Sequence, residues 1–348
     1  MYAELTKARL SLLVVVTAAV GFLLGSPAGV NWLEMFWQMF LSVIGGRAGD
    51  AMALGGAGLR TVDWLGLGIV VAGVGLAAAG TSALNQWMEV DRDSAMRRTA
   101  NRPLPARHMS RNEAFFAGIA MVASGAALLY FLVNPLAGTL TLFTAAIYIF
   151  IYTPMKARSP LNTLVGAVCG AIPPLIGWAA AAGNLALGAW ALAGILFIWQ
   201  LPHFLALAWM YREDYERGGF RMLPLVDRSG ELTSQVAVVT SLLLVPLGLM
   251  AVLALRAPAA APGQTAAITS GFDGGLVYAA LALVLGVLMI IKAVALYRQR
   301  SERAARGLFI ASIIYLPLLL IALVLDQPRP SITAVHFQQT LVAAEKHE

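Results

Sequence analysis

Three oxygen-bearing side chains stand four residues apart in the first half of the chain, where a long apolar run gives way to charged residues. They are Asn85, Glu89 and Asp93, and in a continuous helix they lie on one face. Carboxylate and amide oxygens are ligands for a hard divalent cation such as Mg²⁺. The spacing therefore predicts a Mg²⁺ site at the inner end of a buried helix.

Arginines follow this acidic face at Arg97, Arg98 and Arg102. Guanidinium groups bind phosphates through paired N–H donors, and phosphates commonly accompany Mg²⁺. The alternative is a solvated loop whose arginines only orient the protein in a membrane. The positive-inside rule predicts Lys and Arg in cytoplasmic loops, but it does not predict a row of Asn, Glu and Asp on one helix face. The combination indicates a membrane enzyme that handles a diphosphate.

A second charged cluster occurs about four predicted spans later, with Asp214 between Arg212 and Arg217. Asp214 is a candidate metal ligand, and the two arginines are candidate donors to phosphate or carboxylate groups. An ordinary amphipathic helix end is the alternative for this cluster taken alone. If two half-bundles face each other across one cavity, this cluster lies opposite the first.

Other polar residues allow two interpretations each. Lys156 is suited to neutralise a departing diphosphate, with Tyr152 donating a hydrogen bond, but it equally suits a positively charged anchor at a helix end. Lys7 and Arg9, at the inner end of the first apolar run, have the same ambiguity. His203 is the one histidine expected at membrane depth; a lone buried histidine is usually hydrogen-bonded within the core, and a substrate contact is the alternative.

The elements that must position these residues are membrane helices. Of the 348 residues, 59% are hydrophobic and only 12% are charged, with a mean hydropathy of +0.76. A soluble domain carries far more charge. We therefore expect an all-α, polytopic bundle of about nine helices around a central cavity that opens near the cytoplasmic face. Each span approaches the roughly 20 residues that a bilayer requires, at about 10–25, 64–90, 112–132, 135–152, 161–181, 186–209, 232–255, 275–297 and 307–325.

Charge placement supports this count of spans. Most of the 24 lysines and arginines fall in the expected inner segments, which places the N-terminus in the cytoplasm and the C-terminus outside. The net charge of +6 is therefore a topology signal, and we expect no nucleic-acid partner. No Arg- and Ser-rich segment precedes the first apolar run, which favours a bacterial inner (plasma) membrane over an organelle. The one cysteine, Cys169, is expected to be a buried, inert thiol.

The chemistry is expected in a single domain, residues 1–325. An outer insertion at 26–63, an Ala- and Pro-rich outer loop at 257–275 and a polar tail at 326–348 are given no catalytic role.

The pattern Asn85-x3-Glu89-x3-Asp93-x2-Met96-x-Arg98-Thr99-x2-Arg102-Pro103 resembles the first signature of the UbiA-type intramembrane prenyltransferases. Four further segments, at 152–158, 170–178, 199–204 and 211–224, are similar to the branch of that family that acts on heme. The resemblance covers residues 5–25 and 64–325. One departure is that Gly218 stands four residues after Asp214, where the wider superfamily usually has a second aspartate. The second acidic motif is therefore poorer in carboxylates, which argues against a symmetric two-metal site.

The resemblance implies transfer of the farnesyl group of farnesyl diphosphate to a vinyl group of heme B, with addition of water, giving heme O and diphosphate. It implies that heme B and farnesyl diphosphate are the substrates, that heme A synthase is a candidate partner, and that the lipid bilayer is the medium. His203 and Arg212 become candidate contacts for the heme iron or its propionates. Mg²⁺ is the implied cofactor, held by Asn85, Glu89, Asp93 and Asp214, and the implied diphosphate contacts are Arg98, Arg102, Tyr152, Lys156, Lys7 and Arg9.

Two other functions remain open on the sequence. A transferase of the same type with an aromatic or quinone-precursor acceptor is the main alternative. A transporter is less favoured, because it would place ionisable residues near the bilayer midplane, whereas these lie at inner helix ends.

Overall fold

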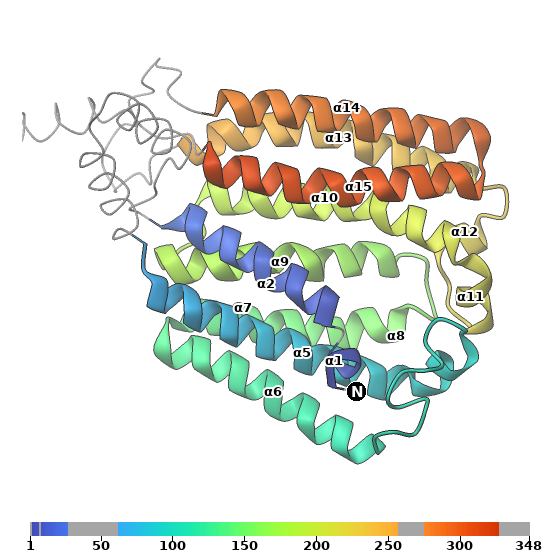
Figure 1. Cartoon of the computed structure of the whole chain (residues 1–348), viewed down its shortest axis with the longest axis horizontal. Coiled ribbons are helices and arrows are strands. Elements are labelled where there is room, and N and C mark those ends of the chain that lie inside the picture. The colour runs from blue at the N-terminus through green and yellow to red at the C-terminus, as the bar shows by residue number, and fades with distance from the viewer. Residues whose placement is uncertain (1, 7, 27–61, 257–274, 327–348) are drawn as a thin grey trace, which may run out of the picture.

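A computed structural model describes residues 2–6, 8–26, 62–256 and 275–326, and these residues form helices and no strands (Figure 1). Most of the 26–63 insertion, of the 257–275 loop and of the 326–348 tail lies outside the described residues. The helices, including one π-helical segment (η1), are α1 (Tyr2–Leu5), α2 (Ala8–Gly25), α5 (Trp64–Ala95), α6 (Arg111–Leu132), α7 (Pro135–Ala146), η1 (Ile147–Tyr152), α8 (Thr153–Met155), α9 (Asn162–Ala182), α10 (Leu187–Met210), α11 (Arg212–Arg217), α12 (Leu223–Val226), α13 (Glu231–Arg256), α14 (Leu276–Gln299) and α15 (Glu302–Leu325).

The predicted all-α membrane fold is confirmed. Within the described residues, eight helical segments are long and apolar enough to cross a bilayer. The first predicted span corresponds to α2, whose apolar part, Ser11–Gly25, is shorter than these eight. The span predicted at 135–152 is composite, because α7 passes into the wide turn η1 and then into α8. In η1 the N–H of Thr153 bonds to the carbonyl of Tyr148, five residues back, and such π-helical turns often occur at functional sites.

The helices form two adjoining groups, which meet where α9 packs against α10 (Figure 1). One group contains α2, α5, α6, α7 and α9, and the other contains α10, α13, α14 and α15. Helices in lipid associate through close packing and not through the hydrophobic effect, so small residues at their contacts matter. At Gly177 of α9, an added Cβ would collide with the backbone carbonyl of Ala18 in α2. These two helices can therefore approach only because the residue is glycine.

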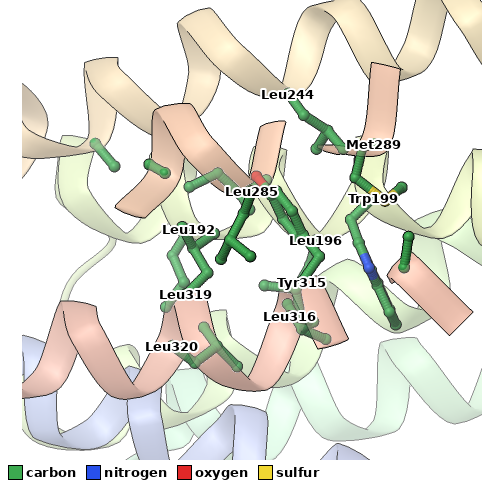
Figure 2. Close-up of a cluster of buried hydrophobic side chains, with 14 of the residues drawn as sticks. Leu192, Leu196, Trp199, Leu244, Leu285, Met289, Tyr315, Leu316, Leu319 and Leu320 are labelled. Atoms are coloured by element: carbon green, nitrogen blue, oxygen red, sulfur yellow. The ribbon is translucent and has the colours of Figure 1, made fainter. Parts of the chain in front are cut away.

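The second group is held by large buried side chains from four helices (Figure 2). Leu192 on α10, Met289 on α14 and Tyr315 on α15 are almost completely buried there. Trp199 of α10 adds a directional contact, because its indole N–H donates to the backbone carbonyl of Ser312 at 2.8 Å. This group therefore fixes α10, which also faces the first group.

The short helices α11 and α12 and the segments that follow α5 and α8 lie at one end of the bundle, on the right in Figure 1. The two charged clusters that the sequence identifies, 85–102 and 212–217, therefore belong to the same end of the molecule.

Candidate active site

The acidic face of α5 has the geometry that its spacing predicts. Asn85, Glu89 and Asp93 all lie within the continuous helix and are 0%, 3% and 1% exposed. The helix begins after Asp63, whose side chain accepts the N–H of Gly66 at 2.8 Å, and ends at Ala95. Polar groups buried this deeply in a membrane protein are costly unless they are paired or functional.

Glu89 forms an ion pair with Lys156, which follows α8 directly. The Lys156 ammonium lies 3.1 Å from each carboxylate oxygen and 4.6 Å from the centre of the Tyr152 ring. Only Oε2 accepts a hydrogen bond with good geometry, so Oε1 is a buried oxygen without one. Burial by itself lowers the pKa of Lys156, but the Glu89 carboxylate, together with Tyr148 and Tyr215, raises that pKa above its ordinary value, so the lysine stays charged.

Asp93 is paired with the loop that follows α5. Its Oδ2 lies 2.7 Å from Nη1 of Arg102, and its backbone carbonyl accepts the hydroxyl proton of Thr99 at 2.8 Å. Asn85 completes the face by donating to Oγ1 of Thr153 at 3.2 Å. The loop after α5 thus folds back over the end of its own helix, and α8 closes the other side.

Asp214 lies in α11 and is 8% exposed. Its two carboxylate oxygens accept the backbone N–H groups of Arg97 and Arg98, each at 3.2 Å, and Arg217 lies 3.4 Å away. The structure therefore joins the two charged clusters, as expected, but it does so through the backbone of the Arg97–Arg98 segment. The side chain of Arg98 lies over the rings of Tyr211 and Tyr215, at 5.3 and 5.6 Å from their centres.

A cavity of about 180 Å³ lies in the membrane part of the bundle, on the outer side of the acidic face. Its walls come from α2, α5, α7, η1, α9 and α10, and they are mainly small or apolar with a few hydroxyl and amide groups. Thr81 and Ser82, on its α5 wall, lie about one turn before Asn85. The wall also includes Tyr148, Tyr152, Cys169, Gln200 and Phe204. The location of this apolar space next to buried carboxylates suits a substrate with a charged head and a hydrocarbon tail.

A second, more polar cavity of about 450 Å³ lies at the inner end, beside α11. Four arginines line it, together with Trp209, Asp214 and Glu302; they are Arg97, Arg98, Arg212 and Arg217. Arg212 is therefore placed beside Asp214, on a different cavity from the one lined by Thr81 and Ser82 of α5.

His203 lies apart from both cavities. Its Nδ1 is 2.8 Å from Oγ of Ser312, and its ring stacks between Trp199 and Phe309, with ring centres 4.9 Å away in each case. Lys7 lies outside the described residues, as does the side chain of Arg9.

The structure thus brings together six of the predicted site residues, namely Asn85, Glu89, Asp93, Arg102, Tyr152 and Lys156. Arg98 and Asp214 lie at the edge of this group, whereas Arg212 and His203 lie elsewhere. Sequence reasoning missed Thr153 and Tyr148. The spacing of Tyr148 and Tyr152, whose ring centres are 4.8 Å apart, is the one local signal that could have suggested Tyr148.

The donor chemistry of the acidic face fits Mg²⁺. Among the described residues, no group of three or more His, Cys, Asp or Glu side chains is close enough to enclose a metal by itself. Mg²⁺ does not need such a cage, because it usually keeps several waters and binds one or two carboxylates plus substrate phosphates. The buried Oε1 of Glu89, which lacks a hydrogen bond, is an oxygen of the required kind.

A multi-pass helix bundle with buried carboxylates above an apolar cavity defines a membrane-embedded transferase for prenyl diphosphates. Residues 47–315 match the UbiA prenyltransferase family, and the chain belongs to that family. It is 38% identical over 327 residues to a protein of Solibacter usitatus named protoheme IX farnesyltransferase, with 94% of this chain and 98% of that protein covered.

Solved structures show the same fold at low identity. A solved structure of digeranylgeranylglyceryl phosphate synthase superposes with a TM-score of 0.68 at 16% identity, and the match covers 94% of this chain and 97% of that chain. A UbiA homolog from Archaeoglobus fulgidus, bound to GPP and Mg²⁺, gives a TM-score of 0.52 at 14% identity and covers 93% and 99% of the two chains.

Proposed function

We propose that this protein transfers the farnesyl group of farnesyl diphosphate to a vinyl group of heme B, with addition of water, and releases heme O and diphosphate. The observation that carries the proposal is the buried acidic face of α5, paired with Lys156 and Arg102, at the mouth of an apolar cavity. The choice of substrates rests on the relative named protoheme IX farnesyltransferase, which this chain matches over nearly its whole length.

The acidic face is the proposed Mg²⁺ site. Asn85, Glu89 and Asp93 would hold the cation, and the homolog bound to GPP and Mg²⁺ supports the use of Mg²⁺ in this fold. When bound, Mg²⁺ neutralises charge that develops on a departing diphosphate. Lys156 and Arg102, the partners of Glu89 and Asp93, are near enough to contact diphosphate oxygens as well.

Asp214 takes part in the proposed site mainly by holding the segment after α5. Its bonds to the N–H groups of Arg97 and Arg98 fix the loop that carries Arg98 and Arg102, so these side chains can meet a diphosphate without a large ordering cost. Each carboxylate oxygen keeps a second lone pair, so Asp214 remains a proposed Mg²⁺ ligand while it holds this segment.

The cavity is proposed to bind the farnesyl chain and to protect its reactive carbon. Loss of diphosphate leaves a cation-like allylic carbon, which the electron-rich vinyl group attacks. The rings of Tyr152 and Tyr148 lie at the wall nearest Lys156, and aromatic faces stabilise an adjacent positive charge. The mainly apolar lining excludes bulk water from the allylic carbon before the vinyl group reaches it.

The binding site for heme B is proposed from the positions of charged side chains. The arginine-lined cavity beside α11 matches the two propionates of heme B, with Arg212 as the principal contact. His203 stays a proposed contact on the apolar side of the macrocycle. Because Trp199 and Phe309 cover its two ring faces, heme B would have to reach the partly exposed edge of this ring. An acceptor that is a simple aromatic compound would leave this cluster of arginines without a role.

The proposed location is the bacterial inner membrane, with the N-terminus in the cytoplasm and the C-terminus outside. This orientation rests on the distribution of charge along the chain. Heme A synthase is the proposed partner, because it would consume the heme O that the reaction forms.

The direct experiment is to incubate the purified protein with farnesyl diphosphate and Mg²⁺ and to offer heme B and an aromatic carboxylic acid acceptor in competition. We expect heme O as the prenylated product in mass spectrometry and no prenylated aromatic acid. Prenylation of the aromatic acid alone would replace heme with the alternative acceptor class. Removal of divalent cations with a chelator should stop the reaction, and added Mg²⁺ should restore it.

A further inference from the structure

Gln200 lies in the wall of the farnesyl cavity, on α10, and the role proposed for that cavity does not use it. It is 6% exposed. Among the described residues that line the cavity, it supplies the one amide side chain, and no carboxylate lines it. Buried amides are normally bonded at both ends, so the environment of each end of this group matters.

The orientation of the amide is fixed by its nitrogen. Nε2 donates to the backbone carbonyl of Leu196 at 3.0 Å and to that of Ala167 at 3.4 Å. Only the NH₂ end of the amide can donate to a carbonyl, so both of its protons are committed. The carbonyl end, Oε1, accepts no hydrogen bond from any described residue.

Gly170 on α9 leaves the room that this amide occupies. A Cβ at position 170 would collide with Oε1 of Gln200 and come within 2.7 Å of its Cδ and Nε2. Gly170 and Gln200 thus form one arrangement, in which a fixed carbonyl oxygen borders a mainly apolar space.

Three of the hydroxyl groups in the cavity wall have already used their protons. The hydroxyls of Thr81, Thr141 and Thr144 donate to the carbonyls four residues earlier, at 2.7, 2.9 and 2.7 Å. Such a hydroxyl is oriented by a carbonyl of its own helix. The amide oxygen of Gln200 is a strong acceptor, and its orientation is fixed by carbonyl groups on two helices, α9 and α10.

The depth of Gln200 suits the reacting carbons. Its amide bonds to Ala167, which is five residues beyond Asn162 in α9, or about 7.5 Å along the helix. Asn162 lies at the level of Lys156, because its side chain donates to the carbonyl of Arg221, whose N–H donates to the carbonyl of Lys156. With the diphosphate at Lys156, the first carbons of the farnesyl chain reach the level of Gln200.

We propose that Oε1 of Gln200 positions the water molecule that completes the reaction. This inference rests on the proposed function. After the farnesyl carbon bonds to the vinyl terminus, the positive charge lies on the vinyl carbon attached to the pyrrole. A lone pair of the water forms the new C–O bond there, an O–H bond breaks, and the proton passes to the diphosphate released in the first step. Gln200 accepts a hydrogen bond from this water and so directs its oxygen; it is a positioning residue.

Without a positioned water, the same cation can instead lose a proton from the adjacent carbon and form an alkene, which is lighter than heme O by one water. The ratio of the two products is therefore the measurement. Gln200→Met keeps the size and removes the amide, and Gly170→Ala displaces the amide without changing it. In each variant we expect the ratio of heme O to alkene to fall about tenfold, the effect of losing one hydrogen bond to the water, with diphosphate release reduced much less.

Thr144→Val is the matched control, because it removes a polar group of the same cavity whose proton is already used; its product ratio should equal that of the wild type. Wild-type turnover in water labelled with heavy oxygen should place the label in the product hydroxyl. If Gln200→Met lowers diphosphate release and both products together at an unchanged ratio, the residue only packs α9 against α10 and the inference is wrong. If Gln200→Met does not fold, an unchanged ratio in Gly170→Ala rejects the inference in the same way. Failure of the wild type to prenylate heme B would instead reject the proposed function.

Discussion

Removal of both partners of the buried Glu89–Lys156 pair should destabilise the protein by less than the sum of the two single removals. Two unit charges 3.1 Å apart attract by about 5 kcal/mol at an effective dielectric constant of about 20. Glu89 is 3% exposed and Lys156 is 8% exposed, so either residue alone would be a buried, uncompensated charge. Loss of one partner of such a pair typically costs about 3–5 kcal/mol.

The test is a double-mutant cycle with Glu89→Gln, Lys156→Met and the combination, measured as the free energy of unfolding in mixed detergent micelles. We expect each single substitution to lower that free energy by about 3 kcal/mol or more. We expect the double substitution to be more stable than the sum of the two effects by about 2 kcal/mol. Farnesyl transfer should be lost in all three, because both residues also belong to the site. A coupling free energy near zero would refute the ion pair and the closure of the site by α8.

Four further predictions concern the site, the heme contact, the packing and the topology. Asp93→Ala should abolish transfer while leaving membrane insertion intact, and near-normal Mg²⁺-dependent turnover would remove Asp93 from the metal site. His203→Ala should weaken heme B binding and leave farnesyl diphosphate affinity unchanged in equilibrium titrations; the opposite pattern would move this residue to the diphosphate side. Gly177→Ala should lower the unfolding free energy by about 1–3 kcal/mol, whereas Gly68→Ala, where the added Cβ meets nothing, should be neutral or stabilising. A reporter fused after α15 should lie outside the cytoplasm and one in the 210–231 loop inside; finding both on one side would contradict the proposed orientation.

The acidic face could be predicted from the sequence because it depends on a single helix. Residues four apart share a face wherever the helix is continuous, so the relation of Asn85, Glu89 and Asp93 follows once α5 is helical. The membrane spans are predictable for the same reason, since length and apolar composition are local properties.

The surroundings of that face were not predictable, because they depend on contacts between distant segments. Asp214 was expected to provide oxygens to a metal, and that stays a prediction; its carboxylate in addition accepts the backbone N–H groups of Arg97 and Arg98. Backbone groups leave no trace in a pattern of side chains, so spacing alone could not reveal this contact. The π-helical turn at Ile147–Tyr152 was likewise hidden, since the run is uniformly apolar and aromatic.

The direction of side chains on α10 was also beyond the sequence. This helix is apolar nearly all round, so no polar face indicates which side meets the cavity. Gln200 faces the cavity, whereas His203, three residues later, faces α15 and bonds to Ser312. Which neighbour a residue on such a helix meets is decided by packing with α9 and α15.

The most direct test of the account is to follow labelled farnesyl diphosphate and heme B with the purified wild-type protein while Mg²⁺ is titrated. We expect diphosphate release and heme O formation to appear together, in equal amounts, and to rise together with the Mg²⁺ concentration. Heme O formation at full rate without any divalent cation, or diphosphate release with no prenylated heme, would contradict the assignment of the α5 face as the site of farnesyl transfer to heme.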